Sequence, residues 1–277
     1  MTPEEKYGRL GPGRIEGFAL RNNVRDLGGY EVTGGRHIRR GAFIRTTALG
    51  LLTPGELMML GRLAPVVCLD LRSAGEAESL PDPEVDGMAY VRIGGMWDAR
   101  GREVDFSTGD IDRFKEEAAA HAAPSVKPSK LTPGSEDVAS DFMHDMYASM
   151  AFDNPAFQQL FAWMAEGVAP IVLHCSAGKD RTGVAAMLIM LALGASEEDV
   201  LFEYALTNTY RARAIERIQR QNPDSALATL AEGVLPQFGQ AVLETIKDLC
   251  GSYDAYFEAE YGLDADALLA LRQAYTA

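Results

Sequence analysis

The segment at residues 170–183, PIVLHCSAGKDRTG, carries residues suited to nucleophilic chemistry on a bound anion. Five residues separate Cys175 from Arg181, between an apolar strand-like run and an apolar helix-like run. Backbone N–H groups of such a loop can surround a tetrahedral anion, and the start of the helix adds its own N–H groups and dipole. The arginine offers a planar fork to two phosphate oxygens. The same positive field favours a cysteine thiolate, which is a nucleophile.

These properties predict a phosphate-transfer site built from one continuous segment. Cys175 is the expected nucleophile, Arg181 the expected phosphate clamp, and Gly178 permits the turn between them. The residues expected to line the phosphate are Ser176, Ala177, Gly178, Lys179, Asp180 and Arg181.

Other interpretations of the segment fit less well. A Walker-type loop would need a glycine five residues before its second glycine, and Asp180 stands where Ser or Thr would bind Mg²⁺. A buried inert thiol is expected for Cys68 and Cys250 but not for Cys175, which has polar neighbours. Two rival functions are a phosphate-binding module without turnover and a sulfur-transfer or arsenate-reducing enzyme. The intact Cys175, Asp180 and Arg181 disfavour the first, and the lack of a nearby second cysteine disfavours the second.

The elements that must position this loop have clear local signals. Ala169–His174 is expected to be a strand, and Arg181–Leu193 a helix that Gly194 ends. The run 65–70 predicts a buried strand that ends in Asp70, and Met88–Ile93 a weaker strand. Glycines within 27–45 predict hairpins. Helices are expected over residues 54–63 after a capping box, Ile111–Ala122, Ser140–Met150, Asn154–Glu166, Glu197 to about Tyr210, Pro236–Cys250, Tyr253–Tyr261 and Ala265–Tyr275.

This pattern predicts an α/β fold: a short, mainly parallel sheet flanked by helices, with the loop at the carboxyl end of its strand. We expect one domain over residues 1–277, with an N-terminal arm at 1–20, an insertion or mobile loop at 94–135 and a possible helical lid at about 209–235. The sequence gives no indication of oligomeric state.

Composition excludes several classes of protein. The 277 residues are 47% hydrophobic and 24% charged, as in an ordinary soluble domain, and the net charge of −14 argues against nucleic-acid binding. The longest apolar stretch, Val184–Leu193, is too short to span a membrane, and the first thirty residues show no signal peptide. Three scattered cysteines suit a reducing compartment, so we expect a cytoplasmic protein, with leaderless export left open. Four histidines without ligand spacing imply no metal.

The segment His174–Gly183 resembles the signature loop of the cysteine-dependent protein tyrosine phosphatase superfamily. Its Gly-Lys-Asp-Arg interior is similar to the bacterial atypical PtpB- and LipA-like branch of tyrosine, dual-specificity and phosphoinositide phosphatases. The resemblance covers about residues 21–275, with Arg45-Thr46 as a mild departure from the branch's Arg-Ser. Weaker matches are Asn23–Gly29, Asp70–Ser73 with Glu76, Glu203-Tyr204 with Asn208, and Glu244–Ile246 with Gly251–Tyr253.

The resemblance implies hydrolysis of phosphomonoesters through a phosphocysteine, without a cofactor. Its substrate would be a phosphorylated protein or a phosphoinositide. The general acid stays open. The branch implies Asp180, whereas Asp70 is an alternative at a strand end, and Asp98 is a third candidate because no Trp-Pro-Asp occurs. Thr182 is expected to hydrogen-bond the thiolate, unless it is an ordinary first-turn residue of the helix.

Several charged residues have both a functional and a structural interpretation. The resemblance implies that His174 holds the loop and tunes the thiol. Lys179 is either a second cation at the phosphate or a salt-bridge partner of Asp70 or Glu76. Arg25 and Asp26 are expected to support the loop from behind, and Arg72 is expected to form a structural pair with Glu76. Four arginines after the signature helix either attract an acidic substrate or form a solvated basic face: Arg211, Arg213, Arg217 and Arg220.

Overall fold

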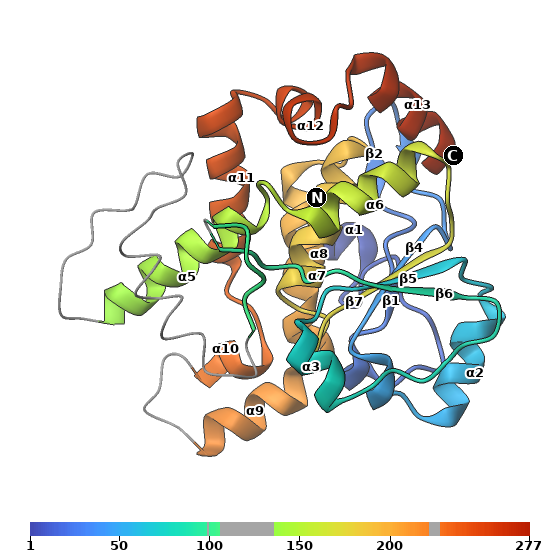
Figure 1. Ribbon diagram of the computed structural model, residues 1–277, viewed down its shortest axis with the longest axis vertical. Coiled ribbons are helices and arrows are strands. Elements are labelled where there is room, and N and C mark those ends of the chain that lie inside the picture. Colours follow the sequence, from blue (N-terminus) through green and yellow to red (C-terminus); the bar gives the residue numbers. More distant parts are fainter. Residues whose placement is uncertain (99, 106–135, 222–227) are drawn as a thin grey trace.

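A five-stranded sheet forms the centre of the molecule in the computed structural model, which describes residues 1–98, 100–105, 136–221 and 228–277 (Figure 1). The strand order is β1-β4-β7-β5-β6, with β1 antiparallel to β4 and the other neighbours parallel. The strands are β1 (Arg25–Asp26), β4 (Phe43–Thr46), β5 (Val67–Asp70), β6 (Ala89–Arg92) and β7 (Ile171–His174), with β2 (Glu31–Val32) and β3 (Arg36–His37) as a separate hairpin. The mainly parallel α/β fold is therefore confirmed.

Helices cover both faces of this sheet, because alternate strand residues point to opposite sides. Ile44, Cys68 and Val172 pack with Leu60 of α2 (Pro54–Arg62) in a small core. Phe43, Leu69 and Leu173 on the opposite face belong to a larger core, which most of the longer helices complete. These are α5 (Glu136–Met150), α6 (Pro155–Ala165), α7 (Arg181–Ala192), α8 (Glu197–Tyr210), α11 (Pro236–Cys250), α12 (Tyr253–Tyr261) and α13 (Ala265–Tyr275).

The helix that follows β7 lies at the centre of the larger core. Every residue of α7 is buried, as expected for a helix that is apolar on all sides. The sheet fixes the position of the N-terminus of α7, because the loop before it starts at the end of β7. There His174 is the register partner of Thr46 in β4 and of Asp70 in β5. The loops that leave the carboxyl ends of β4, β5 and β7 therefore meet at one edge.

Most of the sequence-based elements are confirmed, with a few differences. The expected arm contains a short helix, α1 (Pro3–Tyr7), which starts with a capping box. A further capping box, besides those of α1 and α2, begins α3 (Ala74–Ser79), a helix that was not expected from the sequence. Helix α5 begins at Glu136, earlier than expected, and the helix expected over Ile111–Ala122 lies outside the described residues. Within the described part of the chain, no helix is long and apolar enough to cross a membrane.

Candidate active site

The loop between β7 and α7 is shaped by close contact with the end of β4. Asp180 is the N-cap residue of α7, and Arg181 is its first residue. Gly178 has φ +64°, and a Cβ there would lie 2.2 Å from the carbonyl oxygen of Thr46. Only glycine fits both the left-handed backbone and this close approach. The expected role of Gly178 in the turn thus has a concrete steric basis.

The carbonyl groups of the loop are held on its outer side. The Thr47 hydroxyl donates to the Ser176 carbonyl at 2.7 Å, and the Asn23 side-chain amide donates to the Gly178 carbonyl at 2.8 Å. Asn23 has φ +56°, a left-handed conformation that asparagine tolerates better than most residues. Donors behind the loop therefore leave its opposite side to backbone N–H groups, which is the arrangement of an anion-binding cradle.

Cys175 is buried, with 1% of its surface exposed. Burial opposes ionisation of the thiol, and so does the charge of Asp180. The positive charge of Arg181, followed by the hydroxyl and the backbone N–H of Thr182, outweighs them, so the pKa of Cys175 lies below its usual value. The Thr182 hydroxyl is buried, and no group other than this thiol competes for it among the described residues. The surroundings thus favour the nucleophilic thiolate.

Arg181 is oriented by a carboxylate from the neighbouring strand–helix unit. Its two terminal nitrogens lie 2.5 and 2.8 Å from the carboxylate oxygens of Glu76 in α3. Burial would raise the pKa of Glu76, but the hydrogen bonds from Arg181 lower it to about 2. Glu76 also accepts a hydrogen bond of 2.5 Å from the Ser176 hydroxyl. The expected pair of Arg72 with Glu76 is wrong, because Glu76 pairs with Arg181 instead.

The Asp180 carboxylate has two donors. The Lys179 ammonium lies 2.8 Å from it, and the buried hydroxyl of Tyr147 on α5 also donates to it. Burial, followed by the charge of Asp180, raises the pKa of Tyr147 well above its usual value, so the phenol remains a donor. Lys179 therefore pairs with Asp180, and neither Asp70 nor Glu76 is its partner. Sequence reasoning missed Tyr147, which follows no motif and lies 33 residues away.

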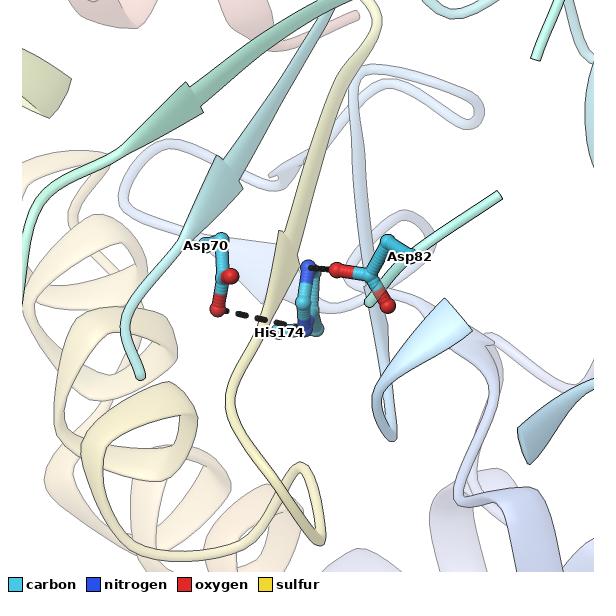
Figure 2. Close-up of side chains that lie close together, drawn as sticks. All are labelled: Asp70, Asp82 and His174. Atoms are coloured by element: carbon cyan, nitrogen blue, oxygen red, sulfur yellow. Dashed lines mark ion pairs between the residues drawn. The ribbon is translucent and has the colours of Figure 1, made fainter. Parts of the chain in front are cut away.

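Asp70 belongs to a buried ion cluster beneath the loop. The Arg72 guanidinium donates to both Asp70 oxygens at 2.8–3.1 Å and also pairs with Asp82 at 2.5 Å. His174 lies between the two carboxylates, as Figure 2 shows, with Nε2 3.1 Å from Asp82 and Nδ1 3.6 Å from Asp70. Burial opposes the charge on His174, but its contacts with Cys68 and Asp82 raise its pKa well above the ordinary value.

This cluster is also the one group of described His, Cys, Asp and Glu residues close enough together to hold a metal ion. The ligand atoms of Asp70, Asp82 and His174 all lie within 4.8 Å of one another. The spacing of the histidines gave no sign of it, because the carboxylates come from distant positions. The protein's own cations already match the two carboxylates: Arg72 binds both, and His174 lies between them. Their charges therefore balance as an ion-pair cluster.

Three further residues that the sequence analysis singled out, Asp98, Asp26 and Arg25, lie outside the loop. Asp98 pairs with Arg102 at 2.7 Å within its own turn. Asp26 accepts hydrogen bonds from the backbone N–H groups of Gly28 and Gly41, so its contacts support the N-terminal hairpins rather than the signature loop. Arg25 lies behind the loop and donates to the Asn23 side chain at 2.5 Å.

The expected lid segment contains two helices, α9 (Ala212–Gln221) and α10 (Ala228–Glu232), on the side where β7 ends (Figure 1). Lys179 donates to the carbonyl of Leu230 in α10 at 2.9 Å, so this segment touches the loop. The side chains of Arg217 and Arg220 on α9 are 65% and 81% exposed. Arg217 lies 3.6 Å from Glu232 and Arg220 lies 3.6 Å from Glu216, and the less exposed Arg211 also pairs with Glu232. Arg213 on the same helix is also exposed, so three arginines of the segment face solvent.

Comparison with known proteins assigns the chain to a class. Residues 18–277 match the model of the tyrosine phosphatase family. A Cupriavidus necator protein named provisionally as a tyrosine-protein phosphatase is 29% identical over 259 residues, which is 91% of this chain and 85% of the relative. The triple specificity protein phosphatase PtpB of Mycobacterium tuberculosis is 28% identical over 238 residues, covering 79% of this chain and 85% of the relative. A tyrosine-protein phosphatase of Nostoc commune is 27% identical over 172 residues, or 61% of this chain and 49% of that protein.

A cysteine and an arginine at one end of a mainly parallel sheet, with carbonyl groups turned outward between them, define a phosphate-handling enzyme. The protein belongs to the tyrosine phosphatase family. It is accordingly a phosphoric monoester hydrolase whose substrates are phosphorylated molecules.

Proposed function

We propose that this phosphatase acts through a covalent phosphocysteine at Cys175. The thiolate attacks phosphorus while the P–O bond to the leaving group breaks, and the Asp180 carboxyl gives its proton to the departing oxygen. Water then attacks the phosphocysteine, Asp180 takes a proton from that water, and the thiolate leaves as inorganic phosphate is released. The reaction balances without a redox partner or a cofactor.

The observation that carries this proposal is the combination of Cys175 and a pre-oriented Arg181 at the start of a buried helix. Glu76 holds the guanidinium through both terminal nitrogens, so its direction is set before phosphate binds. A fixed cation and inward N–H groups stabilise charge that develops in the transition state without further reorganisation. The same groups lower the pKa of the Cys175 thiol.

Asp180 is the better of the three acid candidates on its contacts. The Asp70 carboxylate is fully buried and bound to Arg72 through both oxygens, so it has neither access nor a free acceptor direction. Asp98 is engaged by Arg102 in a separate turn. Asp180 also has partners, Lys179 and Tyr147, but its side chain is 23% exposed, against 9% for Asp98, and begins in the loop itself. We therefore assign it proton transfer to and from the substrate oxygen.

The substrate class that we propose first is a phosphotyrosine or other phosphorylated side chain of a protein. The family and the names of the relatives support this, and one relative is named for triple specificity. A phosphoinositide is the second candidate, favoured by the exposed Arg217 and Arg220 on α9, which packs against α10, the helix that contacts the loop. Such a substrate carries extra phosphates that arginine can bind. We place the reaction in the cytoplasm, in a single domain in which α9 and α10 form the lid.

Turnover by the Cys175→Ser variant tests the covalent mechanism. Serine keeps the cradle and Arg181 but is a far weaker nucleophile at neutral pH. We expect turnover of 4-nitrophenyl phosphate to disappear while vanadate still binds. Cys250→Ser is the matched control and should retain full activity. Turnover by Cys175→Ser above a tenth of the wild-type rate would contradict the proposal. A panel of phosphotyrosine peptide, phosphoserine peptide and phosphoinositide vesicles then ranks the substrates.

A further inference from the structure

Three charged residues from distant parts of the chain meet in the interior behind the signature loop. Arg45 of β4 and Arg25 of β1 are register partners in the sheet, and both bind Glu203 of α8. The nitrogen–oxygen distances are 2.5 Å for Arg45 and 2.6 Å for Arg25. All three side chains are essentially inaccessible to solvent. Burial of charge is costly unless each group is paired, so this arrangement needs a reason beyond packing.

The second terminal nitrogen of Arg45 points at the loop. It donates to the carbonyl of Gly178 at 2.7 Å and lies 3.5 Å from the carbonyl of Lys179. The Gly178 carbonyl and the Lys179 N–H belong to the same planar peptide and point in opposite directions. A donor that holds this carbonyl outward therefore aims the N–H group of Lys179 toward the cradle. Asn23 assists at the same carbonyl, and Arg25 fixes Asn23 in turn.

We propose that Arg45 is a positioning residue of the phosphate cradle and that Glu203 is the residue that positions Arg45. Arg45 touches no substrate; it acts by turning loop carbonyls away from the bound phosphate. The inference rests on the proposed function, since the cradle is the phosphate site of the Cys175 mechanism. It also explains why the network contains two arginines but one carboxylate: the remaining positive charge lies behind an anion site.

The electrostatics of the group agree with this role. Burial, followed by the nearby charge of Arg25, lowers the pKa of Arg45 to about 10, and Glu203 and Cys175 oppose that fall. Arg45 therefore remains a cation at neutral pH. Burial raises the pKa of Glu203, but the two arginines bring it below its usual value, so Glu203 remains an anion. Arg45 thus offers Cys175 a positive charge from the side opposite the substrate.

Variants of two neighbouring β4 residues, Arg45 and Ile44, distinguish a positioning role of Arg45 from a contribution to stability alone. Arg45→Met removes the charge and the donors, and Arg45→Lys keeps the charge but not the fork that reaches both Glu203 and the loop. Ile44→Ala is the matched control, because Ile44 is buried on the same strand but faces the other side of the sheet. Each protein is made in a Cys250→Ser background. The measurements are the pH dependence of iodoacetate alkylation at Cys175, the vanadate dissociation constant and the melting temperature.

We expect Arg45→Met to raise the apparent pKa of alkylation and to weaken vanadate binding by about tenfold or more, as loss of a hydrogen bond to a charged group does. Arg45→Lys should recover part of the alkylation shift but not the vanadate affinity. Ile44→Ala should lower the melting temperature with neither effect. If Arg45→Met matches Ile44→Ala in all three measurements, Arg45 is merely structural and the inference is overturned.

The experiment stays decisive if Arg45→Met does not fold. Wild-type vanadate affinity in folded Arg45→Lys would then overturn the inference, and a loss of affinity would support it. Failure of the proposed function looks different, because Cys175→Ser would retain turnover whatever the Arg45 variants do.

Discussion

The Asp180 carboxylate receives hydrogen bonds from Lys179 and Tyr147, and its role as the acid depends on releasing a proton to the leaving oxygen. Asp180 and two neighbouring residues have different tasks in our account. Cys175 supplies electrons to phosphorus, Arg181 and the cradle hold the phosphoryl oxygens, and Asp180 handles the proton. Each task has a distinct kinetic signature, so each can be tested separately.

Asp180→Asn should slow poor leaving groups much more than good ones. General acids typically contribute ~10²–10⁴ in rate, and a nitrophenolate leaves without much help. We therefore expect phenyl phosphate turnover to fall at least tens-fold more than 4-nitrophenyl phosphate turnover. The measurement is kcat/KM for both substrates, with Asp98→Asn as the matched control that changes neither.

Two outcomes would contradict the assignment of the acid. An equal loss for both substrates, together with weaker vanadate binding, would mean that Asp180 shapes the cradle instead. A leaving-group effect in Asp70→Asn but not in Asp180→Asn would place the acid at the end of β5.

At the scale of elements, the site depends on the close approach of the β7–α7 loop to β4. Gly178 is the point of contact, where any Cβ would lie 2.2 Å from a backbone oxygen. The loop and the end of β4 must therefore shift together if this residue gains a side chain. The carbonyl groups held by Asn23 and Thr47 would move with them.

Gly178→Ala should abolish phosphatase activity and vanadate binding in a protein that still folds. Gly167→Ala is the matched control: Gly167 also has a positive φ, +77°, but a Cβ there meets nothing within 4 Å. Gly167→Ala should lower the free energy of unfolding by roughly 1–2 kcal/mol, because alanine disfavours the left-handed backbone, and should leave activity intact. Activity assays, vanadate titration and thermal melts on both variants give the comparison. Full activity in Gly178→Ala would show that the approach to β4 does not set the geometry of the site.

Local sequence signals predicted most of the elements, because capping boxes, apolar runs and the signature loop are encoded within a few residues. The strand–loop–helix unit at 169–193 is the clearest case. Partners from other elements escaped prediction. Tyr147, Asp82 and Arg45 lie in segments whose own patterns indicate only helix, loop or strand. Their functional contacts exist only once the sheet brings distant segments together, and the wrong pairing of Arg72 with Glu76 has the same cause.

The whole molecule is acidic, with a net charge of −14, yet its anion site is locally positive. Arg181 and Lys179 on the loop, with Arg25 and Arg45 behind it, supply that local field. Acidic surroundings reduce long-range attraction of anions, so binding has to come from short-range contacts within the cradle. Beneath it, the His174 cluster adds a balanced set of charges to the core.

The His174 cluster should make stability depend on pH in a defined direction. The pKa of His174 is raised on folding, so its contribution is complete below the unfolded value of ~6.5 and is lost as pH rises through the folded value. The pKa of Asp82 is lowered, because contacts with His174 and Arg72 outweigh burial. The contribution of Asp82 is therefore present above the unfolded pKa of ~3.9 and is lost as pH falls through the folded value.

The test is the stability difference between wild type and Asp82→Asn across pH. Removal of one partner from a buried ion pair costs about 3–5 kcal/mol, so the difference should be large at pH 5–6.5 and shrink as His174 deprotonates at higher pH. Urea unfolding at each pH measures it, with exposed Asp86→Asn as the control. A difference that is independent of pH would mean that His174 is neutral in the folded protein.

The central claim is that phosphate passes through a covalent bond to Cys175, and chemical quenching during turnover tests it most directly. Wild-type protein mixed with 4-nitrophenyl phosphate is quenched in acid within milliseconds, digested and analysed by mass spectrometry. Our account predicts phosphate on the sulfur of Cys175 in wild type, a larger amount in Asp180→Asn, where hydrolysis of the intermediate is slowed, and none in Cys175→Ser. Phosphate on a different residue, or an unmodified Cys175 under conditions where turnover continues, would contradict it.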